Sequence, residues 1–295
     1  IPAATMADAG FYDVVLTDSI GSTTSRPCRL MVAPVGGYPT TLRLDTSFAP
    51  LFEGNGGSVS RLAVAPGGGV YVAGSFTSIA GQPRRGLARL TADLQIDPDF
   101  VPNIPGAPFK AISVQADGKV LVCGALGLVN GEYISRIARL NLDGTRDWGF
   151  APLVARAGGS ASVSVMAIQP DGKILIGGQF DSVGGLARTS LARLNSDGSC
   201  DTSFFAALDA GTNVFGLALS GDKVVVLGSF KRIGNVIRDG FARLYSDGSL
   251  DQTFVPDSNC RYANSVAASV DGTVYVILPR TETSTDAGIA KLRND

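Results

Sequence analysis

The acidic side chains of this sequence recur in a pattern that could hold a calcium ion. The pattern Asn-x-Asp-Gly-x-x-Asp occurs at 141–147 and at 195–201. Spaced carboxylates and carbonyls supply the oxygen ligands that Ca²⁺ takes in proteins. A hairpin turn followed by an ion pair would use the same residues, and Tyr245 replaces the Asn in the next copy. The pattern therefore leaves two interpretations open, a structural turn, which we favour, and a calcium loop.

The composition excludes several kinds of catalytic and metal site. The 295 residues include no histidine. This rules out Ser-His-Asp catalysis, Cys-His catalysis and any metal site with a histidine ligand. The four cysteines, Cys28, Cys123, Cys200 and Cys260, form no CxxC motif, which argues against structural zinc. We therefore expect no catalytic residue, no metal and no cofactor.

The charge and hydropathy of the chain narrow the choice of partners. The formal net charge is −1, and Lys and Arg form no cluster, so nucleic acid is a poor candidate. No apolar stretch reaches the roughly 18 residues that span a bilayer. With 45% hydrophobic residues, the chain can bury a sizeable core.

The acidic residues are positioned by an internal repeat of about 50 residues. Its most regular element is an Ala-Arg-Leu triplet, which has Arg at positions 89, 139, 193 and 243 and becomes Ala-Lys-Leu at Lys291. Each unit reads as four antiparallel strands: an inner strand a, an apolar strand b, a strand c with the triplet, and an outer strand d. Asp-Gly turns separate a from b in three units and c from d in three, as expected for tight hairpins. Several short strands in a repeat of this length indicate an all-β propeller.

The register of the c–d hairpin can be predicted from its side chains. A two-residue loop at 197–198 would place Leu194 opposite Asp201. A three-residue loop at 196–198 places Leu194 opposite Cys200 and Arg193 opposite Asp201, which pairs apolar with apolar and opposite charges with each other. The same register predicts the pairs Arg89–Asp97, Arg139–Asp147 and Arg243–Asp251. We therefore interpret the repeated arginine as structural.

The repeat also resembles a known family. The segment DGKILIGGQF…LARLNSDGSCDTSF, within 168–204, closely resembles the delta-60 repeat, a bacterial β-propeller repeat. The resemblance covers about residues 41–295 and is weaker in the last unit. It implies a propeller on secreted or surface-exposed bacterial proteins, and it implies no established activity.

The number of strands predicts how the propeller closes. Five a–b–c sets are present, but only four d segments follow them. A fifth d-type segment, 42–48, lies ahead of the first unit and would complete the last blade, with Leu44 opposite Leu292 and Asp45 opposite Lys291. We therefore expect a five-bladed propeller of four-stranded blades over 37–295, closed by an N-terminal outer strand.

Residues 1–36 do not fit the repeat. Asp8, Gly10 and Tyr12 match the D-x-G-x-Y tyrosine corner, so the segment resembles the last two strands of an immunoglobulin-like domain. Val14 stands where antibody-type domains have a cysteine. Because the preceding strands are missing, we expect this chain to be a piece of a longer protein.

Several other residues have both a packing and a functional interpretation. Cys123 and Cys200 align with aliphatic residues of other repeats and should be buried free thiols, while Cys260 lies in a d–a loop where it could be exposed. Trp148 either stacks with Arg146 to cover the outer strand or offers an aromatic surface to a sugar or partner. A second recurring arginine, at 84, 188 and 238, either ties the b–c loops to a neighbouring blade, as we favour, or forms a repeated ligand site.

These observations favour an extracellular or cell-surface binding or adhesion module that is not an enzyme. The b–c and d–a loops are long and differ between repeats, so we expect the ligand face there. The partner would be a glycan, a surface protein or a neighbouring domain of a longer chain. The candidate ligand-binding residues are Phe109, Tyr133, Arg261 and Tyr262. The alternatives are a structural spacer and a secreted glycosidase-like enzyme, but the inner strands carry no Asp or Glu for glycoside hydrolysis.

Overall fold

Five three-stranded antiparallel sheets carry the repeats in a computed structural model of the chain. It describes residues 50–54, 57–104, 108–124, 126–134, 136–269, 271–278 and 288–292, and four short strands within 10–30. The sheets are numbered here in chain order, each with its strands a, b and c. They are sheet 1, β6 (Ser58–Val64), β7 (Val70–Ser75) and β10 (Leu87–Leu90); sheet 2, β11 (Phe109–Val114), β12 (Val120–Gly124) and β15 (Ile137–Leu140); sheet 3, β17 (Ser162–Ile168), β18 (Ile174–Gln179) and β21 (Leu191–Leu194); sheet 4, β22 (Val214–Ser220), β23 (Lys223–Gly228) and β26 (Phe241–Leu244); and sheet 5, β27 (Ser265–Ala268), β28 (Val274–Leu278) and β29 (Gly288–Leu292).

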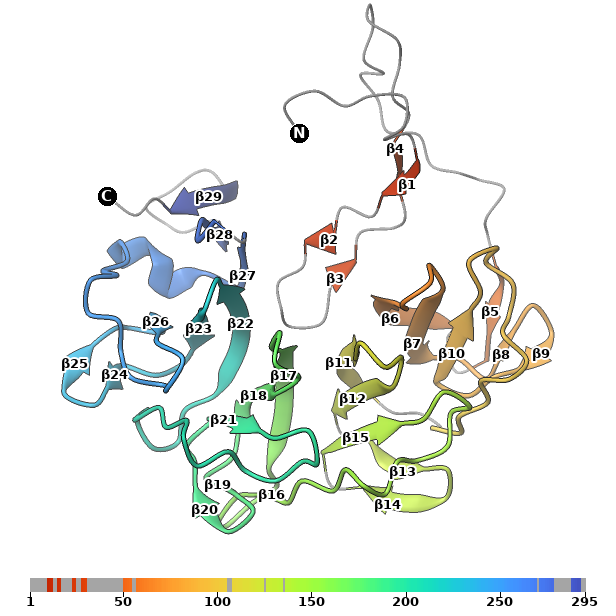
Figure 1. The fold of residues 1–295 in the computed structure, drawn as a ribbon, viewed down its shortest axis with the longest axis horizontal. Coiled ribbons are helices and arrows are strands. Elements are labelled where there is room, and N and C mark those ends of the chain that lie inside the picture. Colours follow the sequence, from red (N-terminus) through yellow and green to blue (C-terminus); the bar gives the residue numbers. More distant parts are fainter. Residues whose placement is uncertain are drawn as a thin grey trace, which may run out of the picture.

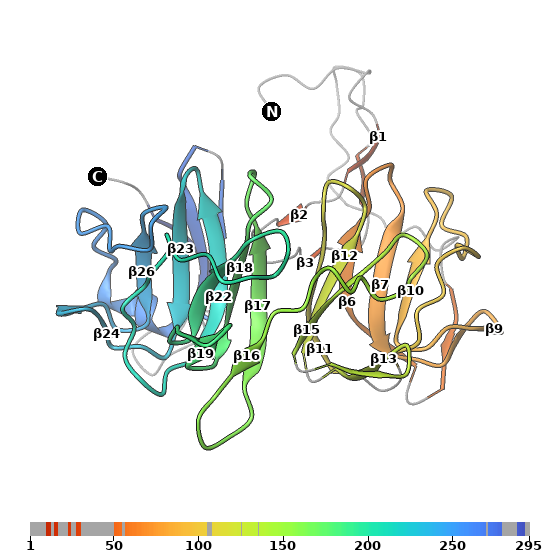
Figure 2. The same cartoon turned by 60° about the horizontal axis from the view of Figure 1, so that its bottom comes forward.

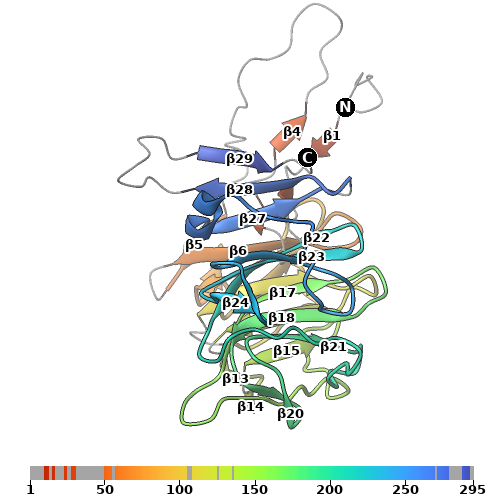
Figure 3. The same cartoon turned by 90° about the vertical axis from the view of Figure 1, so that its left-hand side faces the viewer.

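The sheets follow one another along an arc, with the a strands β6, β11, β17, β22 and β27 side by side on its inner side (Figure 1). Strand b is the middle strand of each sheet, as β28 is between β27 and β29 in Figure 3. Every residue of β12 is buried, because neighbouring sheets cover both of its faces. This explains why the b strands read as continuous apolar runs.

The predicted register of the c–d hairpin is confirmed. Leu194 pairs with Cys200, and the amide of Asn195 donates to the carbonyl of Ser199 across a three-residue loop. The equivalent bridges occur in the other three repeats, at Leu90–Ile96, Leu140–Arg146 and Leu244–Leu250.

The outer strand d is much shorter than predicted. In each of the four repeats it is a single bridge and not a fourth strand, so the sheets of the described chain are three-stranded. The cause is the next residue. The Asp201 carboxylate accepts the amide of Ser203, which bends the backbone into a turn directly after the bridge. Asp97, Asp147 and Asp251 do the same in the other repeats.

The b–c loops of sheets 1 to 4 are themselves small hairpins. They are β8 (Ser78–Ile79) with β9 (Gln82–Pro83), β13 (Gly127–Val129) with β14 (Glu132–Ile134), β19 (Ser182–Val183) with β20 (Leu186–Ala187), and β24 (Arg232–Ile233) with β25 (Val236–Ile237). The d–a segment that enters a sheet binds the b–c hairpin of that sheet. β5 (Phe52–Glu53) pairs with β8, and β16 (Val154–Ala155) pairs with β19. Figure 2 shows β9, β13, β16 and β19 toward one end of the molecule, which we call the loop face. The opposite end, made of the a–b and c–d turns, is the turn face.

The N-terminal segment forms two short antiparallel pairs. β1 (Gly10–Tyr12) pairs with β4 (Cys28–Leu30), and β2 (Val15–Leu16) pairs with β3 (Thr23–Thr24). β3 lies beside β6. In Figure 1, β2 and β3 lie between sheet 5 and sheet 1, which are separated from each other. The segment 42–48, expected to close the last blade, lies outside the described residues.

Candidate functional site

The repeated arginine and aspartate form a recurring unit with a third member. Arg193 Nε lies 2.7 Å from Asp201 Oδ2, and Lys173 Nζ lies 2.8 Å from the same oxygen. Equivalent trios occur in sheets 2 and 4, where Lys119 and Arg139 bind Asp147 and Lys223 and Arg243 bind Asp251. The predicted Arg–Asp pairs are thus confirmed. The lysines were missed, although each stands directly after an Asp-Gly or Gly-Asp pair in its repeat.

The arginine also joins neighbouring sheets. Arg139 Nη1 donates to the carbonyl of Ser196 in the c–d turn of the next repeat, and Arg193 Nη1 donates to Ser246 in the one after. Arg193 is 6% exposed, so these bonds lie in the interior between sheets. The trio therefore holds both the c–d hairpin and the contact between successive sheets.

Hydrogen bonding sets the charge state of these aspartates. Burial alone would raise the pKa of Asp201, but bonds from Lys173, Ser203 and Arg193 outweigh it and hold that pKa far below its usual range. Asp251 is shifted in the same direction by Lys223, Thr253 and Arg243. Both carboxylates are therefore ionised at neutral pH and fixed in structural bonds.

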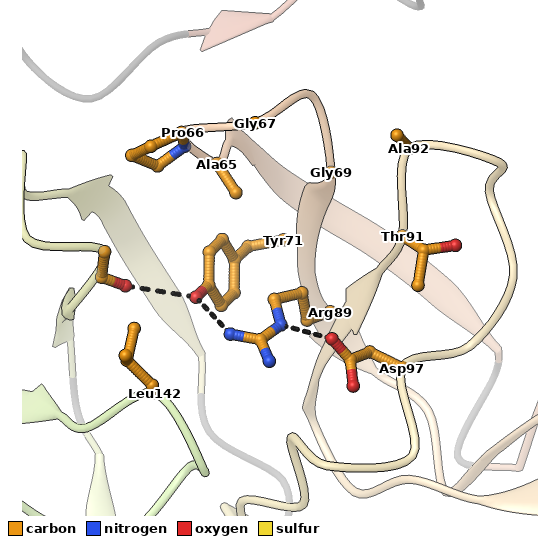
Figure 4. A pocket seen from close by; sticks show the side chains of 11 residues that line it. Ala65, Pro66, Gly67, Gly69, Tyr71, Arg89, Thr91, Ala92, Asp97 and Leu142 are labelled. Carbon is orange, nitrogen blue, oxygen red and sulfur yellow. Dashed lines mark hydrogen bonds and ion pairs between the residues drawn. The ribbon is translucent and has the colours of Figure 1, made fainter.

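Sheet 1 departs from this arrangement and has a pocket of about 250 Å³. Gly69 occupies the position of the lysine, and Tyr71 occupies that of Leu121, Leu175 and Val225. Arg89 Nε still lies 2.7 Å from Asp97 Oδ2, and its Nη1 donates to the Tyr71 hydroxyl, which donates to the carbonyl of Gly118 in sheet 2 (Figure 4). The pocket lies on the turn face, opposite the loops where we expected the ligand.

The predicted ligand-binding residues do not form one cluster of described side chains. Arg261 and Tyr262 lie in the 3₁₀ helix η2 (Ser258–Tyr262), on the d–a segment that enters sheet 5. The guanidinium carbon of Arg261 lies 4.6 Å from the centre of the Tyr262 ring, and its Nη2 donates to the Tyr262 hydroxyl. Tyr262 is 43% exposed, so the stacked pair is open to solvent. Tyr133 lies in β14, opposite Leu128, and its side chain is outside the described part.

Phe109 lies in the core and not on the surface where a ligand-binding residue was expected. Its ring is 4% exposed and packs in a cluster with Ile104 and Ile112. The reason is that β11 begins at Phe109, so the residue belongs to the inner strand and not to the loop before it. We therefore leave Phe109 out of the proposed ligand face.

Trp148 combines both interpretations given to it. The guanidinium carbon of Arg146 lies 4.0 Å from the centre of the Trp148 ring, so the expected cation–π contact is present. Trp148 is nevertheless 63% exposed and offers an aromatic surface at the outer edge of sheet 2.

The second recurring arginine binds within its own repeat. Arg84 Nη2 donates to the carbonyl of Asp97, and Arg188 stacks on Phe205, which directly follows the outer segment of the same repeat. The expectation that these arginines tie the loops to a neighbouring blade is therefore wrong for Arg84, whereas the Phe205 partner of Arg188 also donates its amide to the carbonyl of Asp247 in the c–d turn of sheet 4. Arg84 joins the b–c hairpin to the outer edge of its own sheet.

The cysteines of the described repeats are free thiols. Cys123 is fully buried, and burial raises its pKa to about 12. Cys200, predicted to be buried, is only half-buried, and the partial burial still raises its pKa, as burial raises that of Cys260. Cys260, which lies in a loop where it could have been exposed, is buried, because helix η2 folds it back against sheet 5.

The Asp-Gly turn carboxylates are occupied by turn hydrogen bonds. Asp197 Oδ1 accepts both the amide and the hydroxyl of Ser199, and Asp143 binds Thr145 in the same way. These bonds hold the pKa of Asp197 and of Asp143 below the usual value. In the part of the chain that the structure describes, no three His, Cys, Asp or Glu side chains come together as metal ligands.

Comparison with known proteins agrees with the repeat architecture. Residues 68–100, 115–150, 169–204 and 222–254 match the family described as "Domain of unknown function (DUF5122) beta-propeller". Each matched segment ends at the Phe after the outer aspartate, so the matches coincide with the first four repeats. This chain is a β-propeller protein.

Solved structures give more distant similarities. Two are of the extracellular domain of a B. thetaiotaomicron protein described as a one component or a hybrid two component system. They are 13% and 14% identical, with TM-scores of 0.48 and 0.49, and cover 84% of this chain. This propeller chain spans only 28% of their length. A catalytically inactive virginiamycin B lyase from Staphylococcus aureus, crystallised with quinupristin, is 15% identical with a TM-score of 0.48; 95% of this chain and 87% of the lyase are covered. No curated protein sequence matches the chain.

Proposed function

We propose that this propeller is a non-catalytic extracellular binding or adhesion module whose ligand is held on the loop face. The observation that carries the proposal is that the d–a segments entering sheets 1, 3 and 4 pair with the b–c hairpin of the same sheet. β5 pairs with β8, β16 pairs with β19, and Leu208 bridges to Ile233. These pairs fix loops of variable sequence on a regular frame, which is how binding surfaces are commonly built.

The exposed Arg261–Tyr262 pair is the best-defined contact point on this face. A tyrosine offers an apolar ring face and a hydroxyl, and arginine adds a planar cation, a combination enriched at protein interfaces. A glycan or a surface protein is therefore the partner class that we expect. Tyr133, in the b–c hairpin of sheet 2, is the second candidate.

The acidic side chains favour binding over catalysis. Glycoside hydrolysis needs two carboxylates across the scissile bond, one of them with a raised pKa. Asp97, Asp147, Asp201 and Asp251 are instead engaged by arginine, and their pKa values are lowered. The a strands, which line the inner side of the arc, contain no Asp or Glu.

Two finer assignments belong to the same proposal. We infer that the repeats over 37–295 are delta-60 repeats forming five blades, the last completed by the segment 42–48. We also infer that residues 1–36 derive from an immunoglobulin-like domain, since Gly10–Leu30, Phe11–Arg29 and Tyr12–Cys28 pair as a hairpin around the tyrosine-corner motif. An extracellular location follows from the delta-60 resemblance. Within the described residues, no helix is long and apolar enough to cross a membrane.

A binding screen of the intact chain on glycan and surface-protein arrays tests the proposal. Hits are then compared with the variants Tyr262→Ala and Arg261→Ala. The matched control is Trp148→Ala, which removes an aromatic ring from another exposed Arg–aromatic stack away from the loop face. We expect the loop-face variants to lose at least about tenfold in affinity, as truncation of a central aromatic or Arg contact does. Turnover of a glycan hit, or loss confined to Trp148→Ala, would overturn the proposal, and a screen without hits would favour the structural spacer.

A further inference from the structure

The pocket of sheet 1 lies where the other sheets hold a lysine side chain. Lys119, Lys173 and Lys223 place their ammonium groups 2.7–2.8 Å from Oδ2 of the outer aspartate. In sheet 1 this position is Gly69, and both Gly69 and Asp97 line the pocket. In the part of the chain that the structure describes, Arg89 is the one cation bonded to Asp97 Oδ2. Among the first four sheets, the described residues thus form three filled copies of the site and one open copy.

The backbone of sheet 1 keeps the site open. A Cβ atom on Gly69 would lie 2.6 Å from the carbonyl oxygen of Leu90, so no side chain fits there without a backbone shift. Gly67 and Gly68 precede it at φ +91°, a conformation that favours glycine. The turn that carries the Asp-Gly pair in sheets 2 and 3 is therefore replaced by one that cannot supply the lysine.

The remaining walls of the pocket suit an alkyl chain that ends in a cation. Ala65, Pro66, Ala92 and Leu142 offer apolar contacts for methylene groups. Tyr71 also lines the pocket, and the Arg89 guanidinium lies between its ring and Asp97 (Figure 4). In sheet 4 the ammonium of the filled site lies 4.8 Å from the centre of the Tyr245 ring, and Thr91, which also lines the pocket, occupies the position of Tyr245 in sheet 1. The Gly118 carbonyl adds a further acceptor at the wall.

We propose that this pocket binds a primary alkylammonium group, with the ammonium on Asp97 Oδ2 and its alkyl stem along the apolar wall. A free amine and a lysine side chain of a partner share this chemistry. Binding would give the Arg89–Asp97 pair the same net charge as the Arg–Lys–Asp trios of sheets 2 to 4. The pocket is open to solvent. The lysine side chains of the trios are also partly exposed, at 33% for Lys119 and Lys173. The site lies on the turn face and is independent of the proposed loop-face ligand.

Titration of the labelled, intact chain with n-butylammonium, followed by amide NMR shifts, tests the proposal. We expect saturable shifts at Gly69, Asp97 and Gly118, with a dissociation constant of about 1–10 mM for so small a ligand. n-Butanol, which lacks the charge, and tetramethylammonium, which lacks N–H donors, should not saturate at these residues. N-acetyl-lysine methylamide tests the lysine source, and binding by either amine supports the site. Shifts equal to those given by n-butanol would overturn the proposal.

Two variants separate the site from general effects. Ala92→Phe fills the pocket from an exposed position without touching the ion pair, and it should weaken n-butylammonium binding by at least tenfold. Lys173→Ala opens the equivalent position beside Asp201, and it should add a second set of saturable shifts at Asp201. Unchanged binding in a folded Ala92→Phe variant, or no new site in a folded Lys173→Ala variant, would contradict the proposal, so either variant alone is sufficient as a test.

Discussion

Replacing Asp201 by Asn should cost this protein much of its stability. The carboxylate has 8% side-chain exposure, and it binds Arg193 and Lys173 through Oδ2 and Ser203 through Oδ1. The substitution removes the charge but keeps the shape, so Arg193 stays buried beside a neutral amide. Removing one partner of a buried ion pair costs about 3–5 kcal/mol. Lys173 is one third exposed, and its bond adds less than about 1 kcal/mol. Because the amide side chain of the variant retains one acceptor for Ser203, we expect a loss at the lower end of that range, about 3 kcal/mol in the free energy of unfolding.

Urea unfolding at pH 7 measures this loss, and Asp197→Asn is the matched control. Asp197 lies in the same hairpin and makes turn bonds to Ser199, but it is exposed and has no ion-pair partner among the described residues. It should lose clearly less. The pH dependence gives a second test, because the pKa of Asp201 is lowered in the folded state. Its contribution is complete above the unfolded pKa of about 4 and is lost as the pH falls below it. The difference between wild type and Asp201→Asn should therefore shrink below about pH 4. Equal losses of unfolding free energy in the two variants at pH 7 would contradict this prediction. A difference between wild type and Asp201→Asn that grows below pH 4 would also contradict it.

Three further predictions concern packing between sheets and the thiols. Gly248→Ala should lower the free energy of unfolding by about 1–3 kcal/mol more than Gly221→Ala. A Cβ atom at Gly248 would lie 2.7 Å from the Phe205 backbone, while Gly221, also at positive φ, faces open space, so equal losses in urea unfolding would contradict this prediction. Arg139→Lys should lower the free energy of unfolding by about 1–2 kcal/mol more than Arg89→Lys. Of these two arginines, Arg139 also binds the next repeat, at Ser196, while Arg89 binds Tyr71 of its own sheet. A lower melting temperature for Arg89→Lys than for Arg139→Lys would contradict this prediction. In a Cys28→Ser background, Cys123, Cys200 and Cys260 should react with a thiol reagent only after denaturation, because burial raises the pKa of each; rapid labelling of the native protein would show that one of them is misplaced.

The sequence could predict the features that repeat. The order of strands a, b and c and the c–d register follow from side-chain alternation and from the Asp-Gly turns, and Leu194 indeed lies opposite Cys200. The single-bridge outer segment was missed because a local side-chain bond of Asp201 ends the strand, and strand propensity does not report such bonds.

The features that do not repeat were harder to predict. Whether Phe109 and Cys260 are buried depends on where the d–a segments meet their own sheets, which is a tertiary contact without a periodic signal. The pocket of sheet 1 does have a sequence signal, since Gly69 aligns with Lys119, Lys173 and Lys223. That signal becomes meaningful only once the lysines are seen on the outer aspartates, 28 residues later in each repeat.

Hydrogen–deuterium exchange with and without a ligand from the array screen tests the central claim, ligand binding on the loop face, most directly. We expect slower exchange in helix η2 or in the b–c hairpin of β13 and β14, and no change in the a–b and c–d turns at 171–172 and 197–198. Protection confined to those turns, with the loop face unchanged, would contradict it.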